Sequence, residues 1–294
     1  KFRVRNQWSL ISFTLLLQFA VGIFVVMTTL FGYNLFKSNV PFQKELINRV
    51  LWVFFTALII ALVSSFLHLG KPKSAIYALN NLGSSWLSWE ILFIILFSLS
   101  AAVFTFGRII WNITPKLEFT YLVFVSIIGL MLIYSMSKIY MLETIPVWDS
   151  YYTIIHFYSS LIVLGLLGLI LIISNTNNTL LEGLESTKVI NTSLSIILVV
   201  LFLSIIFLLI RLWNLKLGGI AELSSFNSIT SKNIPLLYAR IILAVLAIGL
   251  IVLQLFYLRF KYSSYLLLSL AIIIILSEIT GRYLFYASYR RVGI

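Results

Sequence analysis

Eight long stretches of this sequence have no Asp, Glu, Lys or Arg, and they constrain the fold more than any other feature. A helix needs about 20 predominantly apolar residues to cross the roughly 30 Å hydrocarbon core, and apolar residues beyond the bounding charges extend the shorter stretches. Alternation of polar and apolar residues, which marks a membrane β-strand, is absent. The sequence therefore predicts an all-α integral membrane protein with eight transmembrane helices. The stretches are residues 6–36, 50–70, 91–107, 119–137, 150–181, 189–210, 241–258 and 262–277.

The composition excludes an ordinary soluble domain. Hydrophobic residues make up 61% of the 294 residues and charged ones only 10%, against about a quarter charged in soluble proteins. We attribute the net charge of +12 to residues that flank the helices and meet lipid headgroups, not to nucleic-acid binding. The protein has no cysteine and two histidines, His68 and His156. It is therefore expected to hold no disulfide, no iron–sulfur cluster and no metal.

The even number of helices predicts that both termini lie on one side of the membrane, which we call face A. The loops after the second, fourth and sixth helices share this face, and the other loops form face B. Face A carries more Lys and Arg than face B, which favours a cytoplasmic face A by a modest margin. Its two long loops are expected at residues 71–88 and 211–235. The protein is predicted to divide into two four-helix halves, residues 1–148 and 149–294.

Polar residues gather where the second helix ends and the third begins. Gly70 and Pro72 are expected to end the second helix and to hold His68 at the membrane boundary on face A. Ser85 and Ser88 are candidate N-terminal caps of the third helix, and Glu90 falls in its first turns, where the helix dipole favours a carboxylate. A histidine and a carboxylate that face each other across a short loop form a candidate proton-handling pair.

Both residues also have a simpler structural interpretation. A histidine at the end of a membrane helix is often only an interfacial polar side chain. A glutamate near a helix N-terminus is often only a partner of the dipole. Ionisable groups indicate function by default only when they lie well inside a membrane span, so position alone leaves His68 and Glu90 undecided.

The same stretch resembles the signature of the dimethyl sulfoxide reductase membrane-anchor family, which reads His-Leu-Gly-x-Pro, then Asn, then Ser-x-Leu-Ser-x-Glu-Ile. The similarity extends over the whole sequence and over four places in the right order, so it is more specific than one motif. The matching residues are His68, Leu69, Gly70, Pro72, Asn80 or Asn81, Ser88, Glu90 and Ile91, with Trp8, Ser9, Leu10, Phe13, Thr14, Gln18, Tyr140, Pro146, Trp148, Glu278, Ile279, Thr280, Gly281, Arg282, Phe285 and Tyr286. Trp89 departs from the pattern, since the family often has a polar or basic residue before the glutamate.

This resemblance implies a membrane-anchor subunit of anaerobic respiration in a prokaryotic cytoplasmic (inner) membrane. Such an anchor binds an iron–sulfur subunit, expected to carry 4Fe–4S clusters, and a catalytic subunit with molybdenum-bis(pterin guanine dinucleotide), Mo-bis-MGD. The anchor does not reduce the terminal acceptor itself but forms the site that oxidises a quinol, typically menaquinol, and it holds no haem or metal.

Family membership also assigns roles to residues of the motif. His68 and Glu90 are the expected residues of quinol binding and oxidation. His68 would accept a hydrogen bond from the quinol, and Glu90 would relay the proton outward. Gly70 would let the backbone approach the ring closely, although a simple helix cap is an equal alternative.

The second histidine leaves a haem-binding alternative open. His68 at the end of the second helix and His156 at the start of the fifth are both expected near face A, so an axial pair for one b-type haem is conceivable. His156 is not part of the family motif and lies in an aromatic run, where a hydrogen-bonded interfacial side chain is the expected interpretation.

Four further residues are expected to have structural roles. Glu278 and Arg282 are four apart, share a helix face and can form an ion pair at the membrane boundary. Tyr140 and Trp148 are interpreted as part of the interfacial aromatic belt in preference to a quinol-stacking surface.

Two other functions are kept as alternatives. A polysulfide- or nitrite-reductase-type anchor also consists of two four-helix halves and interacts with a quinone. A secondary transporter is a different class, and it usually places ionisable residues at the membrane midplane. Because the midplanes of all eight helices are expected to be free of charge here, the sequence favours an anchor.

Overall fold

The computed structural model describes residues 7–37, 44–68, 76–110, 113–174, 186–256 and 264–291, without the side chains of residues 7, 68, 76 and 264. Every regular element in these ranges is helical. The elements are α1 (Gln7–Lys37), α2 (Lys44–His68), the short 3₁₀ helix η3 (Ile76–Asn81), α3 (Trp86–Ile110), α4 (Pro115–Tyr140), α5 (Tyr151–Ser174), α6 (Ser186–Leu217), α7 (Ile220–Asn227), the π-helical turn η5 (Ser228–Lys232), α8 (Ile234–Phe256) and α9 (Ser264–Ala287).

Eight of these helices are long and apolar enough to cross a membrane. They are α1 to α6, α8 and α9, whereas α7 is a single short helix. The prediction of an all-α, eight-span, multi-pass membrane protein is therefore confirmed.

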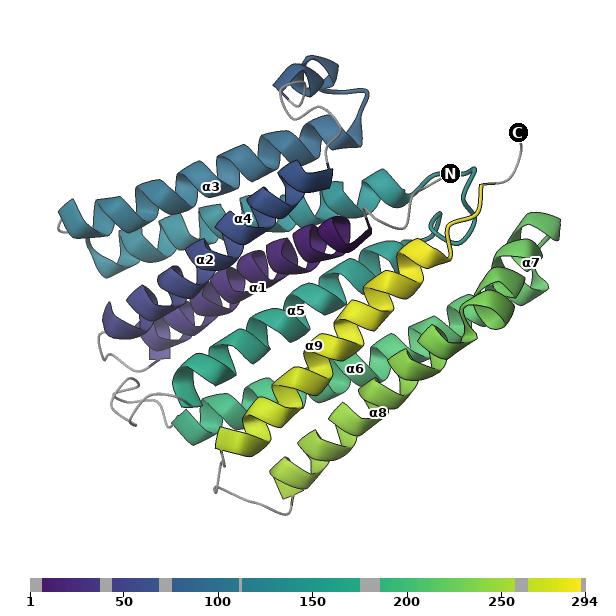
Figure 1. Ribbon diagram of the computed structural model, residues 1–294. Helices are drawn as coiled ribbons and strands as arrows, with labels where there is room; N and C mark the ends of the chain where they lie inside the picture. The colour runs from purple at the N-terminus through teal and green to yellow at the C-terminus, as the bar shows by residue number, and fades with distance from the viewer. Residues whose placement is uncertain are drawn as a thin grey trace.

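The long helices run side by side along one common direction (Figure 1). Helix α1 lies at the centre, where it packs against α2, α4 and α5. Helices α3 and α4 form a pair on one side, and α6, α8 and α9 lie on the other side of α5. Because α1 contacts helices from both parts of the sequence, the division into residues 1–148 and 149–294 stays a prediction.

Two glycines bring α1 and α5 into close contact. A Cβ atom added to Gly22 would lie 2.2 Å from the Leu161 carbonyl oxygen, and one added to Gly165 would lie 2.4 Å from the carbonyl carbon of Gly22. In lipid, helices gain little from the hydrophobic effect and associate mainly through close van der Waals packing. Small residues such as glycine allow the two backbones to approach closely enough for this packing. The two glycines therefore set the position of α5 against the central helix.

The first turn of α1 and the last turns of α9 meet at one end of the bundle, which corresponds to face A. The rings of Trp8 and Tyr283 are 5.6 Å apart there. The expected loop at 211–235 on this face is largely helical, because α6 continues to Leu217 and is followed by α7 and η5. Arg290, just after α9, donates to the Ser224 carbonyl oxygen at 3.1 Å and holds α7 at this end.

Candidate functional site

Helix α2 is described as far as His68, so the expectation that Gly70 and Pro72 end it stays a prediction. The side chain of His68, and all of Gly70 and Pro72, lie outside the described residues. The predicted meeting of His68 with Glu90 around a quinol therefore stays a prediction.

The start of α3 turns Glu90 into the protein. The helix begins at Trp86, and the Ser88 hydroxyl donates to the Ala78 carbonyl oxygen of η3 at 2.6 Å, so Ser88 fastens the preceding loop to α3. Glu90, one turn into the helix, is only 6% exposed. The carboxylate is thus more deeply enclosed than an interfacial dipole partner would be, and ionisable groups so placed usually serve function.

Two tyrosines lie near Glu90. Tyr140 at the end of α4 and Tyr286 near the end of α9 are both within electrostatic range of the Glu90 carboxylate. Their hydroxyl oxygens are 3.0 Å apart and share a hydrogen bond. A carboxylate beside paired hydroxyls can accept a hydrogen bond from a ligand and hold its proton.

The aromatic-belt interpretation of Tyr140 and Trp148 is wrong. Trp148 is 5% exposed, and its Nε1 donates to the Phe285 carbonyl oxygen at 2.7 Å. The rings of Tyr140 and Trp148 meet edge to face at a centroid distance of 5.4 Å. Both side chains belong to an aromatic cluster inside the bundle because α9 runs alongside them, a contact that the sequence does not reveal.

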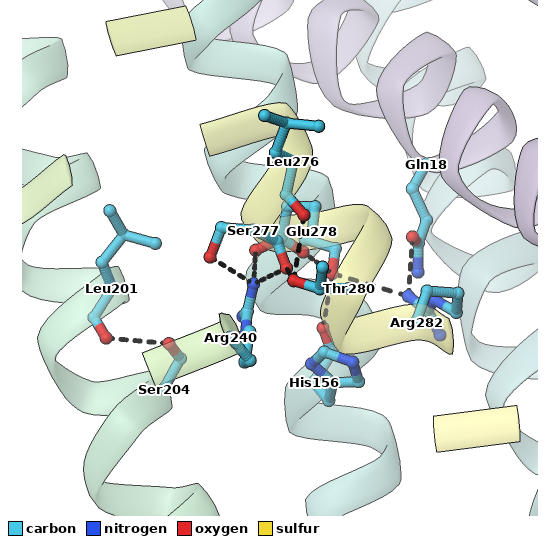
Figure 2. A network of polar contacts seen from close by, with 11 residues as sticks. Gln18, His156, Leu201, Ser204, Arg240, Leu276, Ser277, Glu278, Thr280 and Arg282 are labelled. Atoms are coloured by element: carbon cyan, nitrogen blue, oxygen red, sulfur yellow. Dashed lines mark hydrogen bonds and ion pairs between the residues drawn. The ribbon is translucent and has the colours of Figure 1, made fainter. Parts of the chain in front are cut away.

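A second polar cluster lies between α5, α8 and α9 (Figure 2). One oxygen of the Glu278 carboxylate, Oε1, accepts a hydrogen bond from Arg240 Nη1 at 2.9 Å, and the other, Oε2, accepts one from the Ser160 hydroxyl at 2.6 Å. Arg240 Nη1 also donates to the Ser277 carbonyl oxygen at 2.6 Å. Both charged groups of this ion pair are buried.

Arg282 turns away from Glu278 and towards α1. Its Nη2 donates to Gln18 Oε1 at 2.8 Å, and its guanidinium lies 3.9 Å from the centre of the Phe157 ring. The side chain is completely buried, and its Nε and Nη1 have no hydrogen-bond partner among the described residues. The prediction of a Glu278–Arg282 ion pair is therefore wrong, because the Glu278 carboxylate pairs with Arg240 of α8.

The expectation that the midplanes of the eight helices are free of charge is wrong at Glu278, which lies two residues from the middle of the span Tyr265–Ala287. Among the described residues, Glu90, Arg240 and Arg282 are also ionisable and buried, and they lie within their candidate spans but nearer to the ends. Counting charge-free stretches does not detect these residues, because Arg240 directly precedes the stretch 241–258 and Glu278 directly follows the stretch 262–277. Pro235 could have indicated that Arg240 lies inside the helix. Proline favours the first turn of a helix, so α8 begins near Pro235 and includes Arg240.

Two cavities flank the Glu278–Arg240 ion pair. An apolar groove of about 830 Å³ lies between α1, α2, α5 and α9, with Glu278 in its wall. A smaller cavity of about 120 Å³ lies between α5, α6, α8 and α9, and Arg240, His156 and Arg211 line it. Arg211 donates to the Pro146 carbonyl oxygen at the face A end of this cavity.

His156 is the one histidine whose side chain the structure describes, and it lines the smaller cavity beside Phe285. No group of three or more His, Cys, Asp or Glu side chains gathers anywhere in the described ranges. The alternative of a haem between His68 and His156 is not tested, since the His68 side chain lies outside those ranges.

Known proteins resemble this one over almost its full length. The family of the DMSO reductase anchor subunit (DmsC) matches residues 4–288. The anaerobic dimethyl sulfoxide reductase protein YnfH of Escherichia coli K12 is 26% identical over 289 residues, which cover 98% of this sequence and 96% of that protein. The C subunit of the anaerobic dimethyl sulfoxide reductase of Haemophilus influenzae is 30% identical over 187 residues, or 63% of this sequence and 66% of that protein.

Proposed function

The protein belongs to the family of DMSO reductase anchor subunits (DmsC), and we propose that it oxidises a quinol, typically menaquinol, on behalf of two partner subunits. The partners are an iron–sulfur subunit with 4Fe–4S clusters and a molybdenum (Mo-bis-MGD) catalytic subunit. In this proposal the complex lies in a prokaryotic cytoplasmic membrane. The relatives are named anaerobic dimethyl sulfoxide reductases, which supports dimethyl sulfoxide or a related oxide as the terminal acceptor.

The quinol site is proposed at face A, between His68, Gly70 and Glu90. Oxidation of a quinol to a quinone releases two electrons and two protons, so the site needs acceptors for both hydroxyl groups. His68 accepts a hydrogen bond from one hydroxyl, and Glu90 accepts the proton of the other. The observation that carries this assignment is the burial of Glu90 near the start of α3, since a water-shielded carboxylate suits proton transfer.

The two electrons pass to the nearest cluster of the iron–sulfur subunit, which is proposed to dock on face A. Support comes from the apolar side chains that the elements of this face expose. Tyr77 of η3 and Ile220 of α7 are 71% and 91% exposed, and Leu217 at the end of α6 is 67% exposed. Large apolar residues exposed at the end of a membrane span or beyond it are typical of a protein interface.

Purification of the native complex in mild detergent tests this proposal. We expect an iron–sulfur subunit and a molybdenum subunit to co-purify, with Mo and Fe detected by elemental analysis. His68→Ala should assemble with both partners but lose oxidation of a menaquinol analogue. Recovery of the protein alone, without Mo or Fe and without quinol oxidation, would contradict the anchor function, and transport assays would then test the alternative class.

A further inference from the structure

The large apolar groove runs through nearly the whole thickness of the membrane. Helices α1 and α5 run in the same direction and meet at Gly22 and Gly165, and the groove extends from Trp8 on α1 to Ile172 on α5. At about 1.5 Å per residue these positions make it about 30 Å long. That length matches the roughly 30 Å hydrocarbon core, whereas one phospholipid tail covers a single leaflet. A hydrocarbon longer than an ordinary acyl tail therefore fits it best.

Among the described residues, the wall of this groove is apolar except for Glu278, Ser12 of α1 and Arg49 near the start of α2, and Glu278 is its one carboxylate. Glu278 lies opposite Ser160 of α5, and from that level to Ile172 about 18 Å of groove remains towards face B. The Glu278 oxygens each accept one hydrogen bond, from Ser160 and from Arg240. A carboxylate oxygen can accept two, so each oxygen of the carboxylate retains capacity for one more donor.

Behind Glu278, the smaller cavity leads towards face A. Arg240 lines this cavity while its Nη1 binds Glu278, so the ion pair separates the two spaces. His156 and Ser159 of α5 and Arg211 of α6 add polar groups to the cavity wall. An apolar groove with one carboxylate, backed by a cavity that contains several polar side chains, suits a ligand with a long hydrocarbon tail and a hydroxylated head.

We propose that this groove binds an isoprenoid quinol as a second site, separate from the site at His68 and Glu90. The ring lies at Glu278, whose carboxylate accepts a hydrogen bond from one ring hydroxyl, and the isoprenoid tail follows the groove towards face B. The ion pair with Arg240 keeps the carboxylate an acceptor, so the site favours the quinol over the quinone, which has no hydroxyl to donate. The inference takes the quinol class from the proposed function.

A photoreactive naphthoquinol with a farnesyl tail, added to the whole complex in lipid nanodiscs, tests the groove. Cross-linked peptides are mapped by mass spectrometry in the wild type, Leu16→Trp and Leu246→Trp. Leu16 lines the groove on α1, whereas Leu246 on α8 is 51% exposed and lies in neither cavity wall. The two substitutions add the same volume, and only the first one fills the groove.

Labelling is expected on α1 between Leu15 and Phe19 and on α9 near Glu278. Leu16→Trp should lower it at least about tenfold, equal to a loss of about 1.4 kcal/mol in binding free energy, and Leu246→Trp should retain it. Glu278→Gln should fold and reduce the preference for the quinol over the matching quinone, because its amide can also donate to a carbonyl oxygen.

Three results would overturn the inference. The first is the absence of groove labelling in the wild type, and the second is labelling that excess phosphatidylglycerol displaces but unlabelled quinol does not. The third is cross-linking to another copy of the protein. Glu90→Gln separates the two proposals, since it should abolish quinol oxidation and leave groove labelling intact. If Glu90→Gln oxidises quinol at the wild-type rate, only the proposed function is refuted. If the wild type oxidises quinol but its groove is not labelled, only this inference is refuted.

Discussion

Arg240 Nη1 lies 2.9 Å from Glu278 Oε1 in the interior of the bundle, so one buried ion pair joins α8 to α9. Both groups make further hydrogen bonds, Arg240 to the Ser277 carbonyl oxygen and Glu278 to the Ser160 hydroxyl. Two charges that satisfy each other in this way are tolerated at membrane depth. Removal of one charge leaves the other without its counter-ion.

Glu278→Leu should therefore lower the free energy of unfolding by roughly 3–5 kcal/mol, since a buried charge is left uncompensated. The double variant with Arg240→Leu should lose less than the sum of the two single variants, because it removes both charges. Reversible unfolding in mixed detergent measures all four proteins. Strictly additive losses would show that the two side chains are not energetically coupled.

The close contact of α1 and α5 gives a prediction about packing. In Gly22→Ala, the added methyl group meets the Leu161 carbonyl oxygen, and overpacking of this kind costs about 1–3 kcal/mol. Gly249→Ala on α8 is the matched control, since nothing lies within 4 Å of its added Cβ, and it should gain about 0.5–1 kcal/mol from the higher helix propensity of alanine. Thermal unfolding in detergent checks both, and equal effects would contradict the close contact.

The hydroxyl pair beside Glu90 is expected to support proton transfer. Tyr286→Phe removes the hydroxyl that lies 3.0 Å from that of Tyr140. Quinol oxidation should fall roughly tenfold, which corresponds to about 1.4 kcal/mol of activation free energy. Tyr283→Phe, one turn earlier on α9, should retain the activity. Steady-state rates with a menaquinol analogue measure the effect, and unchanged rates in Tyr286→Phe would remove the tyrosine pair from the proposed site.

The proposed docking surface makes a prediction about assembly. Ile220→Asp places a charge on the most exposed apolar residue of α7, and co-purification of the iron–sulfur subunit should be lost or strongly reduced. Tyr265→Asp changes a similarly exposed residue, 87% exposed, at the opposite end of the bundle, and it should leave assembly intact. Pull-down from solubilised membranes compares the two, and loss of the partner in both variants would point to general misfolding.

The sequence was sufficient to predict the number and type of helices, because lipid requires apolar segments of fixed length. The motif around Glu90 is local, so the sequence could propose this residue for the site, and its role stays a prediction. The ion pair of Glu278 was not predictable, since its partner depends on how α8 and α9 are placed side by side. Tyr140 and Trp148 were misplaced for the same reason: an aromatic residue near a span end can face lipid or α9, and only the packed bundle distinguishes the two.

The central claim is that Glu90 serves the oxidation of quinol, and the most direct test is one comparison of electron donors on the purified Glu90→Gln complex. A reduced viologen dye delivers electrons without a quinol, so it reports on the partner subunits alone. The account predicts normal acceptor reduction with the dye and a loss of at least about 100-fold with a menaquinol analogue, the scale of an acid–base group. Quinol-driven turnover at the wild-type rate would contradict it.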